Sequence, residues 1–238
     1  MSICSLRRGR VFSSLESFQA LLLALLTVVL YNASTISAAP NEAADDKWEA
    51  TIAAFEKMDT DHAPPENGIV FVGSSSIRLW NLKKSFPDLP TINRGFGGSE
   101  VSDSVKYADR IVTKYKPRII VFYAGDNDLA HGKSPEQVAA DVNQFVDIVR
   151  KKLPETPILF LSIKPSQARA NLREKQDAGN LLIKKLADKD PNFKFIDVGT
   201  VLLDEKGVPR KELFLDDQLH LNPKGYQLWR ELLNPYLK

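Results

Sequence analysis

The sequence predicts an α/β protein: a three-layer α/β/α sandwich around a parallel sheet of about five strands. Short continuous apolar runs recur along the chain, segments with apolar residues at helical spacing separate them, and small or polar residues follow the runs directly. Regular alternation of strands and helices implies right-handed crossovers and a parallel sheet covered on both faces. Strands buried on both faces have such continuous apolar sequences.

The predicted elements follow one another in regular order. The predicted strands are the runs 69–72, 91–93, 118–123, 157–162 and 193–197, of which the second is the weakest. The predicted helices cover 45–58, 99–115, 134–152, 172–189 and 223–237. Ser134 is suited to cap the third helix with Pro135 at its first position, and Asn222 is suited to cap the last. Polar residues at the carboxyl ends of parallel strands are where such sheets carry their sites.

Composition excludes several classes of function. The 238 residues carry a formal charge of +2, with basic and acidic residues interspersed, so neither nucleic acid nor an anionic membrane is expected as a partner. The only cysteine is Cys4, which excludes a disulfide framework, a thiolate zinc site and a cysteine nucleophile in the mature domain. With three histidines in the chain, no metal site is expected, and no cofactor is implied.

The N-terminus resembles a secretory signal peptide. Arg7, Arg8 and Arg10 precede the apolar stretch 20–30, and small residues follow it at 34–39. Cleavage after Ala38 is expected, with an uncleaved membrane anchor as the alternative. We therefore expect residues 1–38 to be the signal, 39–66 an N-terminal helix and linker, and 67–238 the functional domain. Such a protein would be exported to the periplasm or the outside, with no stable membrane span after cleavage; its oligomeric state stays open.

Four polar motifs follow the predicted strands or precede the last helix. They are Gly-Ser-Ser-Ser-Ile at 73–77, Asn-Arg-Gly-Phe-Gly-Gly-Ser at 93–99, Ala-Gly-Asp-Asn-Asp at 124–128 and Asp-Asp-Gln-Leu-His at 216–220. Taken separately, each has an ordinary structural interpretation. They could be a capped helix start, a bare glycine loop, a turn closed by Asx hydrogen bonds or a calcium-loop fragment, and a structural histidine. Their order on one α/β pattern favours a single active site.

These motifs resemble those of the SGNH hydrolases, also called GDSL esterases and lipases, whose fold is a flavodoxin-like α/β/α sandwich. The resemblance spans residues 69–226, and the third and fourth motifs are its most specific parts. It implies a serine nucleophile at Ser75, with Asp217 and His220 completing a catalytic triad. It also implies an oxyanion hole formed by Ser75, Gly98 and Asn127.

The first motif departs from the family pattern. Family members usually have Asp before the nucleophile, and this chain has Ser74 there. In the family that Asp is not the triad acid, so its loss should not abolish catalysis. Three adjacent serines are then candidates, and Ser75 is preferred because it keeps the family spacing to Trp80.

The expected activity is hydrolysis of carboxylic esters with small acyl groups, since the connections between elements are short and no lid insertion is evident. The substrate would be a small molecule or a polysaccharide ester, with carbohydrate O-acetyl esters preferred. Lys164 and Arg169 follow the fourth predicted strand and are candidates for binding an anionic or sugar part of the substrate; the alternative is that they are plain surface residues. Alternative functions are a non-catalytic carbohydrate- or ligand-binding module and a lysophospholipase-type lipid esterase.

Overall fold

A computed structural model describes Met1 and residues 46–238; the predicted signal peptide and its cleavage site lie outside this part of the chain. Five parallel strands form one sheet in the order β2-β1-β3-β4-β5. The strands are β1 (Ile69–Gly73), β2 (Thr91–Gly95), β3 (Ile119–Tyr123), β4 (Ile158–Leu161) and β5 (Phe193–Ile196). The predicted fold class is confirmed, including the weak second strand, which lies at one edge of the sheet.

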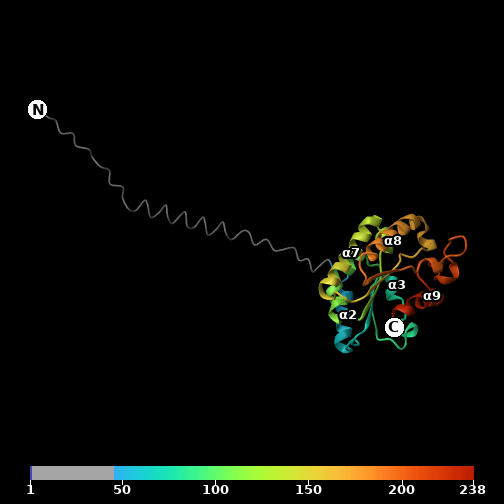
Figure 1. Cartoon of the computed structure of the whole chain (residues 1–238), viewed down its shortest axis with the longest axis horizontal. Coiled ribbons are helices and arrows are strands. Elements are labelled where there is room, and N and C mark those ends of the chain that lie inside the picture. The colour runs from blue at the N-terminus through green and yellow to red at the C-terminus, as the bar shows by residue number, and fades with distance from the viewer. Residues whose placement is uncertain (2–45) are drawn as a thin grey trace. The chain divides into compact units, whose positions relative to one another are not determined.

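Alternate residues of the strands face two separate cores. Val70 and Phe122 belong to one core, and their neighbours Phe71 and Val121 belong to the other. Successive side chains of a strand point to opposite faces, so a sheet covered by helices on both sides needs apolar residues at every position. Helices α2, α7 and α8 lie on one side in Figure 1, and α3 and α9 lie on the other.

The longer helices differ little from those expected, and their bounds follow from their caps. Helix α7 begins at Pro135 because Ser134 and Gln137 form a capping box. Helix α5 begins at Val101 rather than at residue 99, because Glu100 and Asp103 form a second such box. The longer helices are α2 (Glu49–Asp61), α5 (Val101–Ile111), α7 (Pro135–Lys152), α8 (Arg173–Ala187) and α9 (Pro223–Leu233).

Several short helices were not expected from the sequence. A helix of one turn has no room for an apolar period, so pattern analysis cannot detect it. The one-turn α-helices are α3 (Ser75–Arg78), α4 (Leu82–Ser85) and α6 (Asp126–Ala130). The 3₁₀ turns are Thr113–Tyr115, Gln167–Leu172, Thr200–Leu202, Lys211–Leu213 and Asn234–Tyr236. Two of the missed helices, α3 and α6, carry residues of the candidate site.

Helix α2 packs on the same core as the rest of the fold. Its Ile52 is fully buried, and Arg110 of α5 binds both Glu49 and Glu56. Asp59 of α2 also pairs with the buried Arg94 of β2. Although α2 precedes the expected domain start at residue 67, it belongs to a compact unit that runs from Lys47 to Lys238.

The turn after β1 passes very close to the neighbouring strand. Gly73 has a φ of +129°, and a Cβ atom there would lie 1.8 Å from the carbonyl oxygen of Tyr123. The next residue, Ser74, donates its backbone N–H to that same oxygen at 3.0 Å. Only glycine fits both the left-handed backbone and the contact, and this fixes where the chain leaves the sheet and enters α3.

We expect Gly73→Ala to destabilise the fold by more than about 4 kcal/mol, since the added methyl group would overlap a backbone atom that cannot move independently. Gly132→Ala is the matched control: its φ is also positive, at +100°, but nothing lies within 4 Å of the added atom. The free energy of unfolding of the control should fall by only about 1–2 kcal/mol, which is the cost of a left-handed backbone for a residue with a Cβ atom. Urea unfolding of both variants measures the difference, and equal losses would contradict the close-contact explanation.

Candidate active site

The three adjacent serines differ in exposure. Ser74 and Ser76 are both 2% exposed, whereas Ser75 is half-buried at the first position of α3. The Ser75 hydroxyl oxygen lies 2.9 Å from Nε2 of His220, 145 residues later in the chain. Of the three serines, Ser75 is therefore the one in contact with the imidazole.

His220 and Asp217 continue a line of hydrogen bonds from Ser75. Nδ1 of His220 lies 2.6 Å from Oδ2 of Asp217. A carboxylate only accepts hydrogen bonds, so in a neutral His220 ring Nδ1 carries the proton and Nε2 is the acceptor that faces the serine hydroxyl. This is the tautomer that a general base toward Ser75 requires.

Backbone N–H groups after Asp217 donate hydrogen bonds to its carboxylate. The backbone N–H groups of Leu219 and His220 both donate to Asp217 Oδ1 at 2.9 Å, and Gln218 between them has a φ of +52°. Burial would raise the pKa of Asp217, but the hydrogen bonds from the His220 ring and these N–H groups outweigh it and lower the pKa to about 2. The carboxylate therefore stays ionised at neutral pH.

Two side chains from other elements hydrogen-bond to the backbone of helix α3 and of the residues after it. Tyr226 of α9 donates its hydroxyl to the carbonyl of Ser76 at 2.9 Å. Asn93 of β2 donates to the carbonyls of Ile77 and Trp80, and accepts from the backbone of Gly95. The short helix that presents Ser75 is thus held by elements that are distant in sequence.

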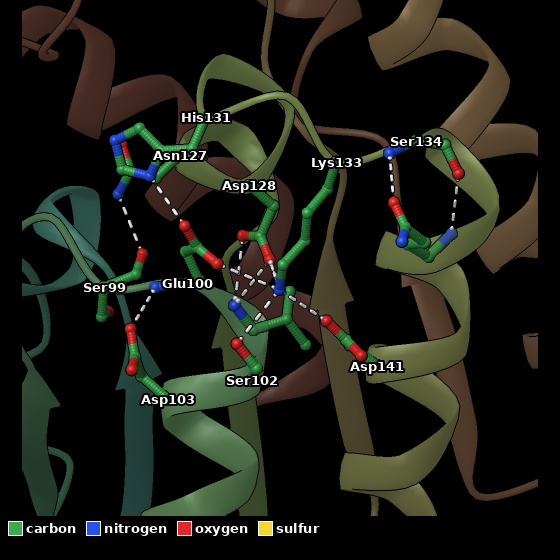
Figure 2. A network of polar contacts seen from close by, with 12 residues as sticks. Ser99, Glu100, Ser102, Asp103, Asn127, Asp128, His131, Lys133, Ser134 and Asp141 are labelled. Carbon is green, nitrogen blue, oxygen red and sulfur yellow. Dashed lines mark hydrogen bonds and ion pairs between the residues drawn. The ribbon is translucent and has the colours of Figure 1, made fainter.

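The predicted oxyanion residues follow three strands that end at one level of the sheet. In the register, Gly73 lies opposite Gly95 on one side and Tyr123 on the other, so the turns after three strands start at one level. Gly98 has a φ of +85°. Asn127 of α6 donates its Nδ2 to the carbonyl of Ser99 at 2.9 Å, which brings its amide beside the glycine turn (Figure 2).

A buried carboxylate joins that turn to α6. Asp128 is fully buried and accepts from the Val101 backbone at 3.1 Å to each oxygen. Lys133 lies 3.0 Å from Asp128 and 2.7 Å from Asp141, and Figure 2 shows it at the centre of the network. Burial raises the pKa of Asp128 in spite of Lys133. His131 is largely exposed and contacts Glu100 at 2.7 Å, outside the Ser75–His220 line.

Lys164 and Arg169 lie in a different setting from the one expected of surface or substrate-binding residues. The Lys164 side chain is 1% exposed, and its ammonium lies 3.4 Å from Asp126 Oδ2. Burial lowers the pKa of Lys164, and its side chain is not accessible to a substrate in this conformation. Arg169 is 17% exposed and contacts both Asp126 and Asn127 at 2.9 Å. Nothing in the local sequence indicates these contacts.

A pocket of about 520 Å³ is lined by residues that follow α3, by α4, by α9 and by the loop before α9; neither Ser75 nor His220 is among its lining residues. Leu79 donates its backbone N–H to the Ser75 carbonyl, and Leu215 donates to the His220 carbonyl, so the pocket is connected to the site residues through the backbone of two lining residues. The rest of the lining includes apolar, polar and basic side chains: Trp80, Asn81, Lys84, Ser85, Leu221, Pro223, Lys224, Tyr226, Gln227 and Arg230.

Within residues 46–238, no group of three or more His, Cys, Asp or Glu side chains is placed to bind a metal ion. No helix in that same range is both long and apolar enough to cross a bilayer.

Comparison with protein families finds a match to the GDSL-like lipase/acylhydrolase family over residues 78–228. The matched segment contains the glycine turn, Asn127, Asp217 and His220, and begins just after Ser75. Among curated proteins, the chain is 26% identical to platelet-activating factor acetylhydrolase IB subunit alpha2 of Rattus norvegicus, over 76% of this chain and 80% of that protein.

Solved structures share the fold at lower identity. A GDSL-like lipase from Bacteroides thetaiotaomicron superposes with a TM-score of 0.67 at 18% identity, covering 79% of this chain and 97% of that one. A catalytic mutant of an acetylxylan esterase from Geobacillus stearothermophilus superposes with a TM-score of 0.60 at 14% identity, covering 73% and 96%.

We expect Asp128→Ala to cost about 2–3 kcal/mol, because it leaves the buried Val101 N–H without an acceptor and removes the one fully buried carboxylate that pairs with Lys133. Asp141→Ala is the matched control, since it removes a carboxylate from the same lysine at a site that is 25% exposed. That change should cost at most about 1 kcal/mol. Chemical denaturation of the two variants tests the ranking, and an Asp141 variant less stable than the Asp128 variant would refute it.

Proposed function

The chain belongs to the GDSL-like lipase/acylhydrolase family and is an ester-cleaving hydrolase, and we propose that Ser75, His220 and Asp217 are its catalytic triad. The observation that carries the proposal is the unbroken line of contacts from the Ser75 hydroxyl through both ring nitrogens of His220 to Asp217. A serine hydroxyl is a weak nucleophile until a base removes its proton, and this geometry supplies the base and the group that orients it.

The proposed reaction proceeds through an acyl-enzyme. The Ser75 oxygen attacks the ester carbonyl carbon while its proton passes to Nε2 of His220. The tetrahedral intermediate collapses, the alcohol leaves with the proton returned by His220, and the acyl group stays on Ser75. A water molecule then attacks the acyl carbon, gives its proton to His220, and the carboxylic acid is released as Ser75 is reprotonated. Throughout, Asp217 stabilises the imidazolium form.

The negative charge that develops on the carbonyl oxygen needs donors fixed in advance. We assign the backbone N–H groups of Ser75 and Gly98 and the side-chain amide of Asn127 to this role. Two observations support this assignment: the turns after β1, β2 and β3 begin at the same level of the sheet, and Asn127 donates to the Ser99 carbonyl. Such donors stabilise the transition state more than the substrate, because the charge is largest there.

The substrate we favour is an ester of a small acyl group, with carbohydrate O-acetyl esters first. The proposal of a small acyl group rests on the sequence, in which no lid insertion is evident. The structural likeness to an acetylxylan esterase concerns the fold and is compatible with this choice.

A second candidate is an acyl ester of an amphiphilic lipid. The pocket of about 520 Å³ has Leu79 and Leu215 among its lining residues, which hydrogen-bond to the backbones of Ser75 and His220, together with Lys84, Lys224 and Arg230. Basic groups beside apolar surface suit an anionic amphiphile. The chain length of the acyl group that is cleaved fastest separates the two candidates.

Export is also part of the proposal, and it is supported by sequence alone. The basic, apolar and small-residue segments before residue 40 have the order of a secretory signal. We propose that the mature hydrolase acts outside the cytoplasm, in the periplasm or the extracellular space.

Ser75→Ala and His220→Ala should each lower kcat on p-nitrophenyl acetate by at least about 10³-fold, because each removes a member of the nucleophile–base pair. Both variants should keep the circular dichroism spectrum of the parent. His131→Ala is the control for histidine loss and should keep most of the activity, since its ring contacts Glu100 instead. Comparing acetate, butyrate and octanoate esters gives the acyl preference. Full activity in Ser75→Ala would remove Ser75 as the nucleophile.

Asn127→Ala should lower kcat by about 10²–10³-fold with little change in KM, the effect of losing one oxyanion donor. Steady-state kinetics on p-nitrophenyl acetate measure both constants. Asn143→Ala, an exposed asparagine on α7, should change neither constant. An Asn127 variant with the parent kcat would disprove its place in the oxyanion hole.

A further inference from the structure

We propose that Arg169 is a positioning residue that holds the Asn127 amide with its nitrogen toward the oxyanion. The inference rests on the proposed role of Asn127. It assigns Arg169 a task different from substrate binding, through a contact between segments 42 residues apart.

The two contacts of the Asn127 amide define its orientation. Nη2 of Arg169 donates to Oδ1 at 2.9 Å, and Nδ2 donates to the Ser99 carbonyl at 2.9 Å. A guanidinium only donates and a backbone carbonyl only accepts. If the amide were rotated by 180°, its NH₂ group would face the Arg169 donor and its oxygen would face the Ser99 carbonyl, and both hydrogen bonds would be lost. One hydrogen of Nδ2 is used by Ser99, and the second is left to donate to a reacting oxygen.

Arg169 is itself held by a buried carboxylate. Its Nη1 lies 2.9 Å from Oδ1 of Asp126, which is 5% exposed and directly precedes Asn127. Lys164 and Gln176, each 1% exposed, approach the same carboxylate at 3.4 Å. Burial would raise the pKa of Asp126, but the positive charges of Lys164 and Arg169 outweigh it and keep the pKa below its usual value. The guanidinium thus has a fixed anionic anchor.

The backbone of Arg169 is constrained as well. It departs from helical geometry inside the turn Gln167–Leu172, with φ −127° and ψ 33°. The preceding residue, Ala168, donates its backbone N–H to the carbonyl of Gln218, in the loop between Asp217 and His220. The turn that carries Arg169 therefore contacts the loop of the catalytic histidine and, through the side chain, the oxyanion loop.

These contacts argue against a direct role in binding substrate. Nη2 of the guanidinium donates to Asn127, whereas Nη1 is buried in an ion pair with Asp126 without forming a hydrogen bond to it, and the side chain is only 17% exposed. A substrate anion would have to displace one of them. Loss of Arg169 should therefore lower kcat more than it changes KM, because the Asn127 amide acts mainly in the transition state.

The test is a double-mutant cycle on p-nitrophenyl acetate with Arg169→Met, Asn127→Ala and the double variant. Arg169→Met should lower kcat about tenfold with KM within about twofold, a smaller loss than removal of the amide itself. In the Asn127→Ala background, the same change should have no further effect on kcat. Arg173→Met is the control, since that arginine pairs with the exposed Asp177 and should leave kcat unchanged.

Arg169→Lys separates orientation from charge and guards against a Met variant that fails to fold. An ammonium can still pair with Asp126, but it lacks the planar fork that spans two acceptors, so kcat should stay low. Three results would each overturn the inference while leaving the triad proposal intact. They are a parent kcat in Arg169→Lys, losses of kcat in Arg169→Met and Asn127→Ala that are independent of each other, and an Arg169→Met variant with a raised KM at the parent kcat. Parent kcat in Asn127→Ala would remove the premise as well.

Discussion

The candidate site depends on the contact between the turn at Gly73 and the carbonyl of Tyr123. Because Gly73 has no side chain, the end of β1 can pack closely against β3. The backbone N–H of Ser74 then donates to the Tyr123 carbonyl, the same group with which a methyl group at Gly73 would overlap. The next residue is Ser75, at the start of a helix of one turn. A helix that short has little stability of its own, so its position is set by its neighbours. Tyr226 and Asn93 provide two of these contacts, from the last helix and the edge strand.

A second constraint is the charge buried next to Asn127. Asp126, Lys164 and most of Arg169 are withdrawn from water, and desolvating such groups costs several kcal/mol per ion before pairing recovers part of it. An apolar cluster of similar size would stabilise a fold at least as well. The ionic cluster differs from an apolar one in that its donors and acceptors are fixed in space. Such groups can orient a neighbouring amide by hydrogen bonding, and apolar side chains cannot. This is the setting in which Arg169 meets Asn127.

Sequence patterns predicted the layers of this fold well because each layer is encoded locally. The strands are continuous apolar runs since both faces of the sheet are covered, and helix α7 carries its own start signal in Ser134 and Pro135. The family motifs likewise marked Ser75, Asp217 and His220, which the structure brings into contact. The pattern missed α3, α4 and α6, because one turn is too short to show a period.

The sequence by itself determined the fold class, the order of the motifs and the residue types available for acyl transfer, since all three follow from local composition and spacing. Only the tertiary structure decided which of three serines contacts His220, because exposure depends on what packs over each hydroxyl. It likewise decided that Lys164 is buried against Asp126, and that Arg169 reaches Asn127. These outcomes join residues 38, 42 and 145 positions apart. Contacts of that kind arise only when the sheet has brought its strand ends together, so no local pattern records them.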